Sequence, residues 1–367
     1  VMVIMARSSA ERIVEVLEEK SSLADPEHPI REVKDGSIDF YHVDFSYIGD
    51  GEKLALKDVD IHIKPGETIG ILGGTGSSKT TFVQLIPRLY DVTAGCLKVG
   101  GRDVRQYDLK SLRDQVAMVL QKNVLFTGTI RDNLKWGSPN ASEEEIIHAC
   151  RLSQADEFIR QFPDQYDTFL DQGGTNVSGG QKQRLCIARA LLKKPRILIL
   201  DDSTSAVDTK TDALIRRALR EEMPDTTKLI IAQRISSVED ADKVIVQSED
   251  MKKIYINEYL KAAKEHGLQG RHLDREFLEQ KFLGLGSPKY DRVCVIAKED
   301  LDIPQDWLKM IRKPDGSWKK IVFYNTSISA LLIYKEKWVA KIEDVLRIFK
   351  ENQNEVALLW RTHPLIE

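Results

Sequence analysis

The stretch between residues 73 and 81 constrains this fold more than any other part of the chain. It reads Gly-Gly-Thr-Gly-Ser-Ser-Lys-Thr-Thr, after an apolar run at 68–72 and before an apolar, helix-like segment at 82–86. A strand, a glycine-rich turn and a helix opening with Lys-Thr form the layout of a phosphate-binding loop. Backbone N–H groups and the helix N-terminus would face a triphosphate, Lys79 would add a positive charge, and Thr80 would offer a hydroxyl to Mg²⁺.

One position in this loop departs from the pattern. The motif has glycine directly before the lysine, whereas this chain has Ser78. Because short Gly/Ser loops with a lysine also occur by chance, the loop alone does not distinguish a nucleotide site from an ordinary turn. The segments downstream distinguish a nucleotide site from an ordinary turn.

Two segments farther along the chain supply what a phosphate site needs. Residues 197–202 read Ile-Leu-Ile-Leu-Asp-Asp, an expected buried strand that ends in the carboxylates Asp201 and Asp202. A carboxylate at the carboxyl end of a parallel strand, beside a phosphate loop, is where a Mg²⁺ ligand is needed. Residues 178–181 read Ser-Gly-Gly-Gln at the start of an expected helix, whose unpaired N–H groups and dipole favour an anion. The sequence therefore predicts two phosphate-binding helix N-termini and a magnesium ligand.

Composition narrows the class of protein. The chain has 367 residues, 42% of them hydrophobic and 30% charged, as in an ordinary globular protein with room for about two domains. A net charge of −3 without a basic stripe gives no electrostatic case for nucleic acid. No apolar run approaches the roughly 20 residues of a membrane span. The four cysteines lie far apart without a CxxC pair, which argues against a disulfide framework or a zinc site; they are Cys96, Cys150, Cys186 and Cys294.

Together these segments resemble the nucleotide-binding domain of ABC transporters of the exporter type, over roughly residues 1–245. The resemblance implies an α/β fold, namely a P-loop NTPase with a RecA-like core, an antiparallel β subdomain and an α-helical signature subdomain. Residues 25–246 would form that domain, and residues 1–24 would be the end of the last transmembrane helix and a linker. The motifs that match in order and approximate spacing are Tyr47, the phosphate loop, Gln121, Val177 to Gln181, Asp201, Asp202, Ser205 to Asp208 and Gln233.

The resemblance also assigns residue roles. Tyr47 resembles the aromatic residue that stacks on adenine, and Thr80, Gln121 and Asp201 would bind Mg²⁺ directly or through water. The catalytic candidates are Gln121, Asp202 and Gln233. The residues expected to bind this chain's own ATP are Tyr47, Gly73, Gly74, Thr75, Gly76, Ser77, Ser78, Lys79, Thr80 and Thr81, whereas Ser178, Gly179, Gly180 and Gln181 would close over an ATP held by a partner domain.

Three departures from the family fall on one site. Asp202 stands in place of the catalytic glutamate, Gln233 in place of the switch histidine, and Ser78 in place of a glycine. A misplacement of about 1 Å can cost on the order of 10²-fold in rate. We therefore expect tight ATP binding with slow hydrolysis here, while the intact Ser178–Gln181 segment completes the site of a different subunit, as in the degenerate half of a heterodimeric exporter. The alternative is a working homodimer that tolerates both variants.

The resemblance implies partners and a location as well. The domain would drive transport of an unidentified substrate through nucleotide-dependent dimerisation with a second nucleotide-binding domain. A transmembrane domain, upstream or in a separate chain, would dock its coupling helices near Leu125 and Phe126. The expected location is the cytoplasmic face of the cell membrane, or the bacterial cytoplasm if the fragment is soluble, with membrane contact only through the transmembrane partner and none with nucleic acid.

The exporter pattern stops after Val246, and residues 247–367 read as a partial second α/β (Rossmann-like) segment. A helical stretch to about residue 284 precedes a βαβ-like unit with strands at 320–324 and 356–360. Through Gly-Ser-Pro-Lys-Tyr-Asp at 286–291 and Arg-x-His-Pro at 361–364, this segment is similar to CDP-glycerol glycerophosphotransferases and GT-B glycosyltransferases. A transferase with a vestigial ATPase part, or a non-functional chimeric fragment, is therefore the alternative to the exporter reading.

Overall fold

A computed structural model describes residues 2–19, 21–49, 53–74, 76–202, 206–233, 235–265, 274–285, 305–325 and 343–361. The chain divides into two compact units, residues 1–294 and residues 295–367. Helix α1 (Met2–Glu18) occupies the N-terminal region where the sequence predicts a helix. No helix in the described ranges combines the length and apolarity needed to cross a membrane.

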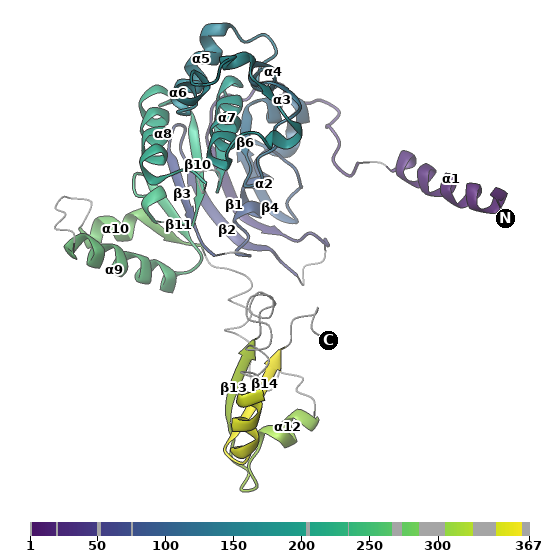
Figure 1. Cartoon of the computed structure of the whole chain (residues 1–367), viewed down its shortest axis with the longest axis vertical. Helices are drawn as coiled ribbons and strands as arrows, with labels where there is room; N and C mark the ends of the chain where they lie inside the picture. Colours follow the sequence, from purple (N-terminus) through teal and green to yellow (C-terminus); the bar gives the residue numbers. More distant parts are fainter. Residues whose placement is uncertain are drawn as a thin grey trace. The chain divides into compact units, whose positions relative to one another are not determined.

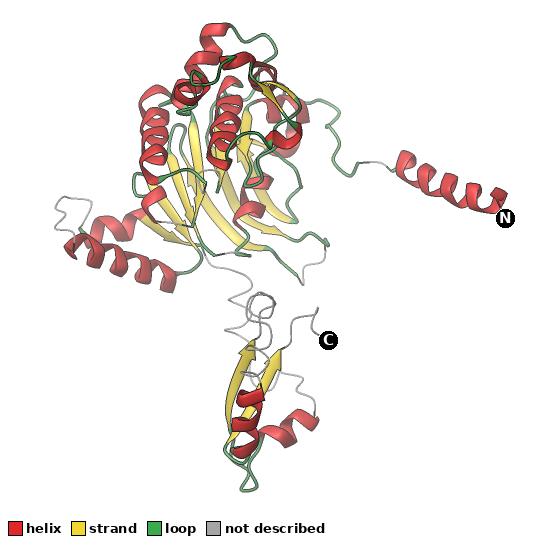
Figure 2. Ribbon diagram, in the orientation of Figure 1, coloured by secondary structure: helices red, strands yellow, loops and turns green. Residues whose placement is uncertain are grey.

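The first unit is built on a six-stranded parallel sheet (Figures 1 and 2). Every neighbouring pair in this sheet is parallel. Its central strands are buried along their whole length, which explains their continuous apolar sequences. The strand order is β12-β11-β3-β10-β9-β6, with bounds β3 (Thr68–Leu72), β6 (Val116–Val119), β9 (Ile197–Asp201), β10 (Thr227–Ala232), β11 (Lys243–Val246) and β12 (Phe282–Gly284).

Alternating side chains along each strand give the sheet two buried faces. Leu198 and Leu200 of β9 pack into one hydrophobic core, whereas Ile197 and Ile199 pack into the other. The first core is formed with the longer helices α5 (Glu143–Leu152), α7 (Gly179–Leu192), α8 (Thr209–Glu222) and α9 (Glu249–Glu265). The second is formed with α2 (Lys79–Leu85), α3 (Leu109–Asp114) and an antiparallel sheet.

That antiparallel sheet is the β subdomain expected from the sequence. Its order is β2-β1-β4-β5, with bounds β1 (Ile38–Phe45), β2 (Leu56–Ile63), β4 (Ala94–Val99) and β5 (Arg102–Asp103), followed by the short turn η1 (Val104–Gln106). Phe40 of β1 stacks on Phe82 of α2, with ring centroids 4.4 Å apart. This contact fixes the β subdomain against the helix that follows the phosphate loop.

The stretch at 129–190 is mostly helical, as predicted, and forms the α-helical subdomain. Capping boxes at Thr129 and Ser142 start its first two helices, since each side chain accepts the N–H of the third residue in its helix. The remaining elements are α4 (Ile130–Lys135), α6 (Asp156–Ile159), the two-stranded pair β7 (Gly128–Thr129) and β8 (Phe169–Leu170), and the turns η2 (Gln165–Asp167) and η3 (Gln172–Gly174).

The parallel sheet continues past residue 246, where the sequence led us to end the domain. After β11, α9 and α10 (Arg275–Lys281) lead to β12, which pairs in parallel with β11. Leu278 and Phe282 join the same core as β9 and α7. Helices α9 and α10 and strand β12 therefore belong to the first unit. The expected helix to about residue 284 ends at Lys281, because Phe282–Gly284 hydrogen-bond as an edge strand.

The second unit contains a parallel pair of strands. Helix α12 (Gln305–Ile311) precedes β13 (Lys320–Asn325), which pairs with β14 (Val356–Arg361) across an intervening helical segment at 343–351. This is the β-α-β order expected for the C-terminal segment. The 286–291 motif and His363 lie outside the described residues.

Candidate nucleotide-binding site

The phosphate loop connects β3 to α2, as the sequence predicts. Lys79, the first residue of α2, folds its ammonium over the loop and donates to the carbonyls of Gly73 and Gly74, each at 2.7 Å, and to Ser77 Oγ at 3.1 Å. Burial lowers the pKa of Lys79, and the nearby carboxylates Asp201 and Asp202 act in the opposite direction. The lysine is thus already directed at the loop that would hold the phosphates. Thr75, another expected ligand, lies outside the described residues.

The departure at Ser78 has a clear structural meaning. Ser78 precedes α2 with φ 60° and ψ 17°, in the left-handed region, and its side chain makes no capping hydrogen bond to the helix. Glycine adopts this conformation without the clash that a Cβ introduces. The motif therefore asks for glycine at this position because of backbone geometry, and this chain holds a serine there under strain.

Thr80 and Asp201, two of the expected Mg²⁺ ligands, are in contact. Thr80 Oγ1 donates to Asp201 Oδ2 at 2.9 Å, at the junction of α2 and the end of β9. Burial raises the pKa of Asp201, and the Thr80 hydroxyl opposes that shift. Within the described ranges no three His, Cys, Asp or Glu residues converge as a metal cage. Mg²⁺ usually takes one or two protein carboxylates with water and phosphate oxygens, so a hydroxyl beside a carboxylate suits it.

Three catalytic candidates meet at Asp202. Gln121 follows β6 and Gln233 follows β10, and their Nε2 atoms donate to Asp202 Oδ2 at 3.3 Å and 2.8 Å. The carboxyl ends of neighbouring parallel strands bring these side chains together. Gln121 is also expected among the Mg²⁺ ligands with Asp201, and this role stays a prediction; in the structure its Nε2 donates to Asp202.

The Ser-Gly-Gly-Gln segment caps α7. Ser178 Oγ accepts the N–H of Gln181 at 3.2 Å, and Ser178 N–H donates to Gln181 Oε1 at 2.9 Å. Ser178 and Gly179 are exposed, so this capped helix N-terminus faces outward. A Cβ on Gly180 would lie only 2.9 Å from the carbonyl oxygen of Ala206, which explains the glycine. The segment is ordered by its own capping box and leaves Ser178 and Gly179 exposed.

Tyr47 lies beside the phosphate loop with its ring open to solvent. Its hydroxyl is 2.9 Å from Thr81 Oγ1 on α2, and its side chain is 54% exposed. Tyr90 contacts it edge to face, with ring centroids 5.2 Å apart. An exposed ring at this distance from the loop is suited to stacking on a base.

The ABC transporter family matches residues 56–205, from the start of β2 through the phosphate loop and the signature segment to the residues after Asp202. The chain contains an ABC-transporter ATP-binding domain. ABC-transporter ATP-binding domains are ATPases, which makes this domain an ATP-hydrolysing enzyme by family.

Relatives of this ABC domain include proteins named for multidrug export and proteins named only as ABC transporter ATP-binding proteins. YgaD of Bacillus subtilis (strain 168), provisionally named a multidrug export ATP-binding/permease protein, is 46% identical over 211 residues, 58% of this chain and 36% of YgaD. The ABC transporter ATP-binding protein YknU of the same strain is 42% identical over 242 residues, 66% of this chain and 41% of YknU. The chain thus spans about two fifths of the length of these curated relatives. The structure of a bacterial Atm1-family ABC exporter with ATP bound superimposes with a TM-score of 0.62 at 32% identity, over 66% of this chain and 42% of that one.

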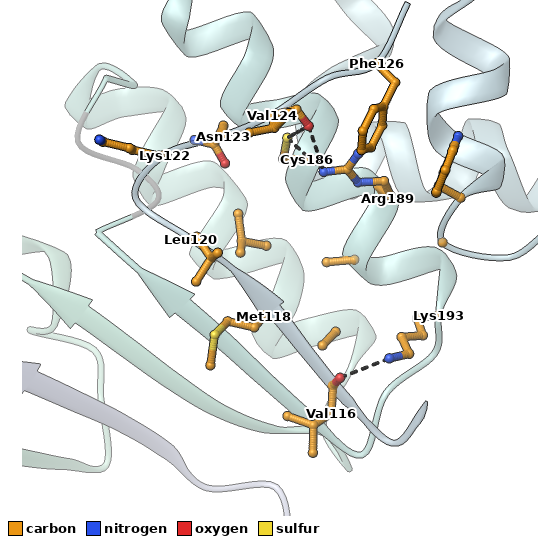
Figure 3. A pocket seen from close by; sticks show the side chains of 15 residues that line it. Val116, Met118, Leu120, Lys122, Asn123, Val124, Phe126, Cys186, Arg189 and Lys193 are labelled. Atoms are coloured by element: carbon orange, nitrogen blue, oxygen red, sulfur yellow. Dashed lines mark hydrogen bonds between the residues drawn. The ribbon is translucent and has the colours of Figure 1, made fainter. Parts of the chain in front are cut away.

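A groove of about 360 Å³ lies on the ABC domain between β6 and α7 (Figure 3). Phe126 stacks on Trp136, with ring centroids 4.7 Å apart, and Trp136 is 66% exposed. Arg189 of α7 donates to the carbonyl of Val124 at 3.0 Å at one end of the groove (Figure 3). Of the two apolar residues expected at a docking site, Phe126 lines this groove, whereas Leu125 is 1% exposed and packs into the core.

Two residues beside the ABC site were missed from the sequence. Tyr90 contacts Tyr47, and Gln247 lies so close to the loop that a Cβ on Gly73 would be 2.7 Å from its Nε2. The available signal for Gln247 was its position directly after β11, the strand that neighbours β3. Nothing local in the sequence distinguishes Tyr90 from other surface tyrosines.

Proposed function

We propose that this chain is the ATP-binding and weakly hydrolysing component of an ABC exporter, acting at the cytoplasmic face of the cell membrane on an unidentified substrate. One observation supports this most strongly. Lys79, Thr80, Asp201 and Asp202 lie together where β3 and β9 end, linked by the Thr80–Asp201 hydrogen bond. This is the set of groups that a Mg²⁺–triphosphate needs, and ATP with Mg²⁺ is the cofactor we propose.

Slow hydrolysis is supported by the surroundings of Asp202. A catalytic carboxylate has to accept a hydrogen bond from the attacking water. Here the amides of Gln121 and Gln233 both donate to Asp202 Oδ2, so that oxygen is already engaged. The side chain is also one methylene shorter than glutamate, and Gln233 cannot take up a proton as histidine does. Bound ATP would therefore persist at this site.

A head-to-tail dimer is supported by the outward-facing signature segment. Ser178 and Gly179 are exposed at the capped N-terminus of α7. There the γ-phosphate of an ATP held by a partner could accept hydrogen bonds from backbone N–H groups. Because this segment keeps the full Ser-Gly-Gly-Gln motif while the chain's own Walker residues depart from pattern, we propose a heterodimer. The partner's site would be the faster one.

A transmembrane partner is supported by the groove between β6 and α7. Its exposed apolar side chains, including Leu120, Val124 and Trp136, offer an apolar surface. Arg189 borders it and adds a donor that could hold a helix end. We propose this groove as the docking place of a coupling helix.

ATPase assays test the proposal. The chain alone should bind MgATP and turn it over slowly, and Lys79→Ala should abolish binding. The double variant Asp202→Glu with Gln233→His should raise kcat, since it restores both family residues. Turnover by the unmodified chain alone at the rate of the double variant would refute the degenerate site, and absence of ATP binding would refute the function itself.

A further inference from the structure

A buried ion-pair network joins α8 to the segment that follows Gln233. Arg216 of α8 has a side chain only 4% exposed, and its Nη1 donates to Asp240 Oδ2 at 2.8 Å. Asp212, one helical turn earlier, accepts from Ser237 Oγ at 3.3 Å. Ser237 ends the short helix η4 (Ile235–Ser237), which begins two residues after Gln233. Two side chains of one helix thus hold the segment that carries the switch position.

This network is incompletely paired. Arg216 Nε lies 3.3 Å from Asp212 Oδ2 but does not hydrogen-bond, and Asp212 Oδ1 is buried without a hydrogen-bond partner among the described residues. A buried charged group that lacks hydrogen-bond partners destabilises the folded state. Unsatisfied buried polar groups are rare in native structures and often mark stored strain or a functional role.

The segment that leads into α8 contacts the signature helix α7. Asp208 caps α8 by accepting the N–H of Thr211 at 3.0 Å. Just before it, Ala206 N–H donates to Gln183 Oε1 on α7 at 3.1 Å. Helix α8 therefore lies between two functional regions, the switch segment of this chain's own site and the signature helix that faces a neighbour.

Helix α10 also contacts the segment that follows η4, at residues 239–240. Lys281, the last residue of α10, donates to the carbonyl of Glu239 at 2.6 Å. Arg220 of α8 donates to the carbonyl of Asp240 at 2.9 Å. Residues 239–240 are consequently tied both to α8 and to α10, so a displacement of this segment has to move α8 or break these bonds.

We propose that Arg216 is a positioning residue that transmits nucleotide occupancy from Gln233 to the start of α8, and from there to the signature helix α7. A shift of Gln233 toward a bound nucleotide moves η4, and the Arg216–Asp240 bond carries that movement into α8. The proposal rests on the proposed function, since ATP is the ligand whose binding it relays.

Amide hydrogen exchange on the whole chain tests this relay. The exchange of residues 206–213 is compared with and without MgATP, and MgATP binding is followed in parallel by thermal shift. In the wild-type chain MgATP should slow exchange at the start of α8. Arg216→Met should keep MgATP binding but lose that protection. The matched control is Arg217→Met on the same helix, whose side chain is 74% exposed and pairs only with Glu221 among the described residues; it should behave like the wild type.

A second variant distinguishes loss of the relay from misfolding of Arg216→Met. Asp240→Ala removes the acceptor of Arg216 Nη1 from a side chain that is 46% exposed, and it should weaken the protection in the same direction. Retained protection in Arg216→Met, or no MgATP-dependent protection of α8 in the wild type despite a thermal shift, overturns the relay alone. No thermal shift in the wild type overturns the proposed function and the relay with it.

Discussion

Replacing Ser78 by glycine should stabilise the chain, because it relieves a strained backbone without removing a contact. Ser78 has φ 60° and ψ 17°, and its side chain makes no capping hydrogen bond to α2. The left-handed conformation costs an L-residue roughly 1–2 kcal/mol. Glycine avoids that cost in the folded loop.

Glycine also brings a cost through the unfolded chain. Its greater backbone freedom there destabilises the folded state by roughly 0.5–1 kcal/mol relative to a residue with a Cβ. Subtracting this from the strain leaves an expected gain of roughly 0–1.5 kcal/mol in the free energy of unfolding. The gain is independent of ATP, since it concerns the backbone alone.

Urea denaturation measures this gain, which should raise the midpoint at constant m-value. The matched control is Gln154→Gly, because Gln154 also has a left-handed φ, 58°, but lies after α5 in the helical subdomain. MgATP at 100 times its Kd should add about 2.7 kcal/mol to both Ser78→Gly and the wild type. A loss of stability in Ser78→Gly, or a gain seen only with MgATP, would refute the reasoning.

Three further predictions concern single groups. Lys79→Ala should abolish the stabilisation by MgATP in a thermal shift assay, and a retained shift would place the phosphates elsewhere. Burial raises the pKa of Asp201 in the folded chain above its ordinary 3.8. The protonated carboxyl is therefore the form that favours folding in the absence of ligand. This contribution to stability is lost as the pH rises through the folded pKa, because the carboxylate is then ionised. Asp201→Asn should therefore be more stable than the wild type at pH 7 without Mg²⁺, with a difference that shrinks as the pH falls toward 3.8 in denaturation curves; a constant difference would contradict this. Burial raises the pKa of the Cys150 thiol to about 12, so iodoacetamide at pH 8 should leave Cys150 unlabelled in the native chain, as checked by peptide mass, and rapid labelling would show that the helical subdomain opens.

The residues of the candidate nucleotide site could be located from the sequence, because the chemistry of such a site fixes residue type and spacing. Lys79, Asp201 and Ser178 each had to stand at the end of a strand or the start of a helix. Those signals are local, so no tertiary information was needed to find them. The hydrogen-bond partner of Gln121 could not be predicted from the sequence. It depends on whether the Gln121 side chain reaches Asp201 or Asp202, which only the fold determines.

The extension of the sheet could not be read in the same way. Strand β12 is only three residues long and directly follows α10, so it shows no alternation that would separate it from the end of a helix. Its pairing with β11 is set by tertiary contacts through Leu278 and Phe282. The role of Arg216 could not be predicted from the sequence either. A charged residue on an amphipathic helix is usually solvated, and only the fold shows that Arg216 is buried and bonded to Asp240.

The short strand β12 has a consequence for how this protein can associate. An open edge of a parallel sheet is a template on which another chain can add a strand. Here the four-residue β11 is paired on that side with a strand of three residues, Phe282–Gly284, which forms the edge. So short a border offers few backbone groups to a foreign strand. At the β12 edge the domain should therefore meet other molecules through side chains rather than by adding a strand to its sheet.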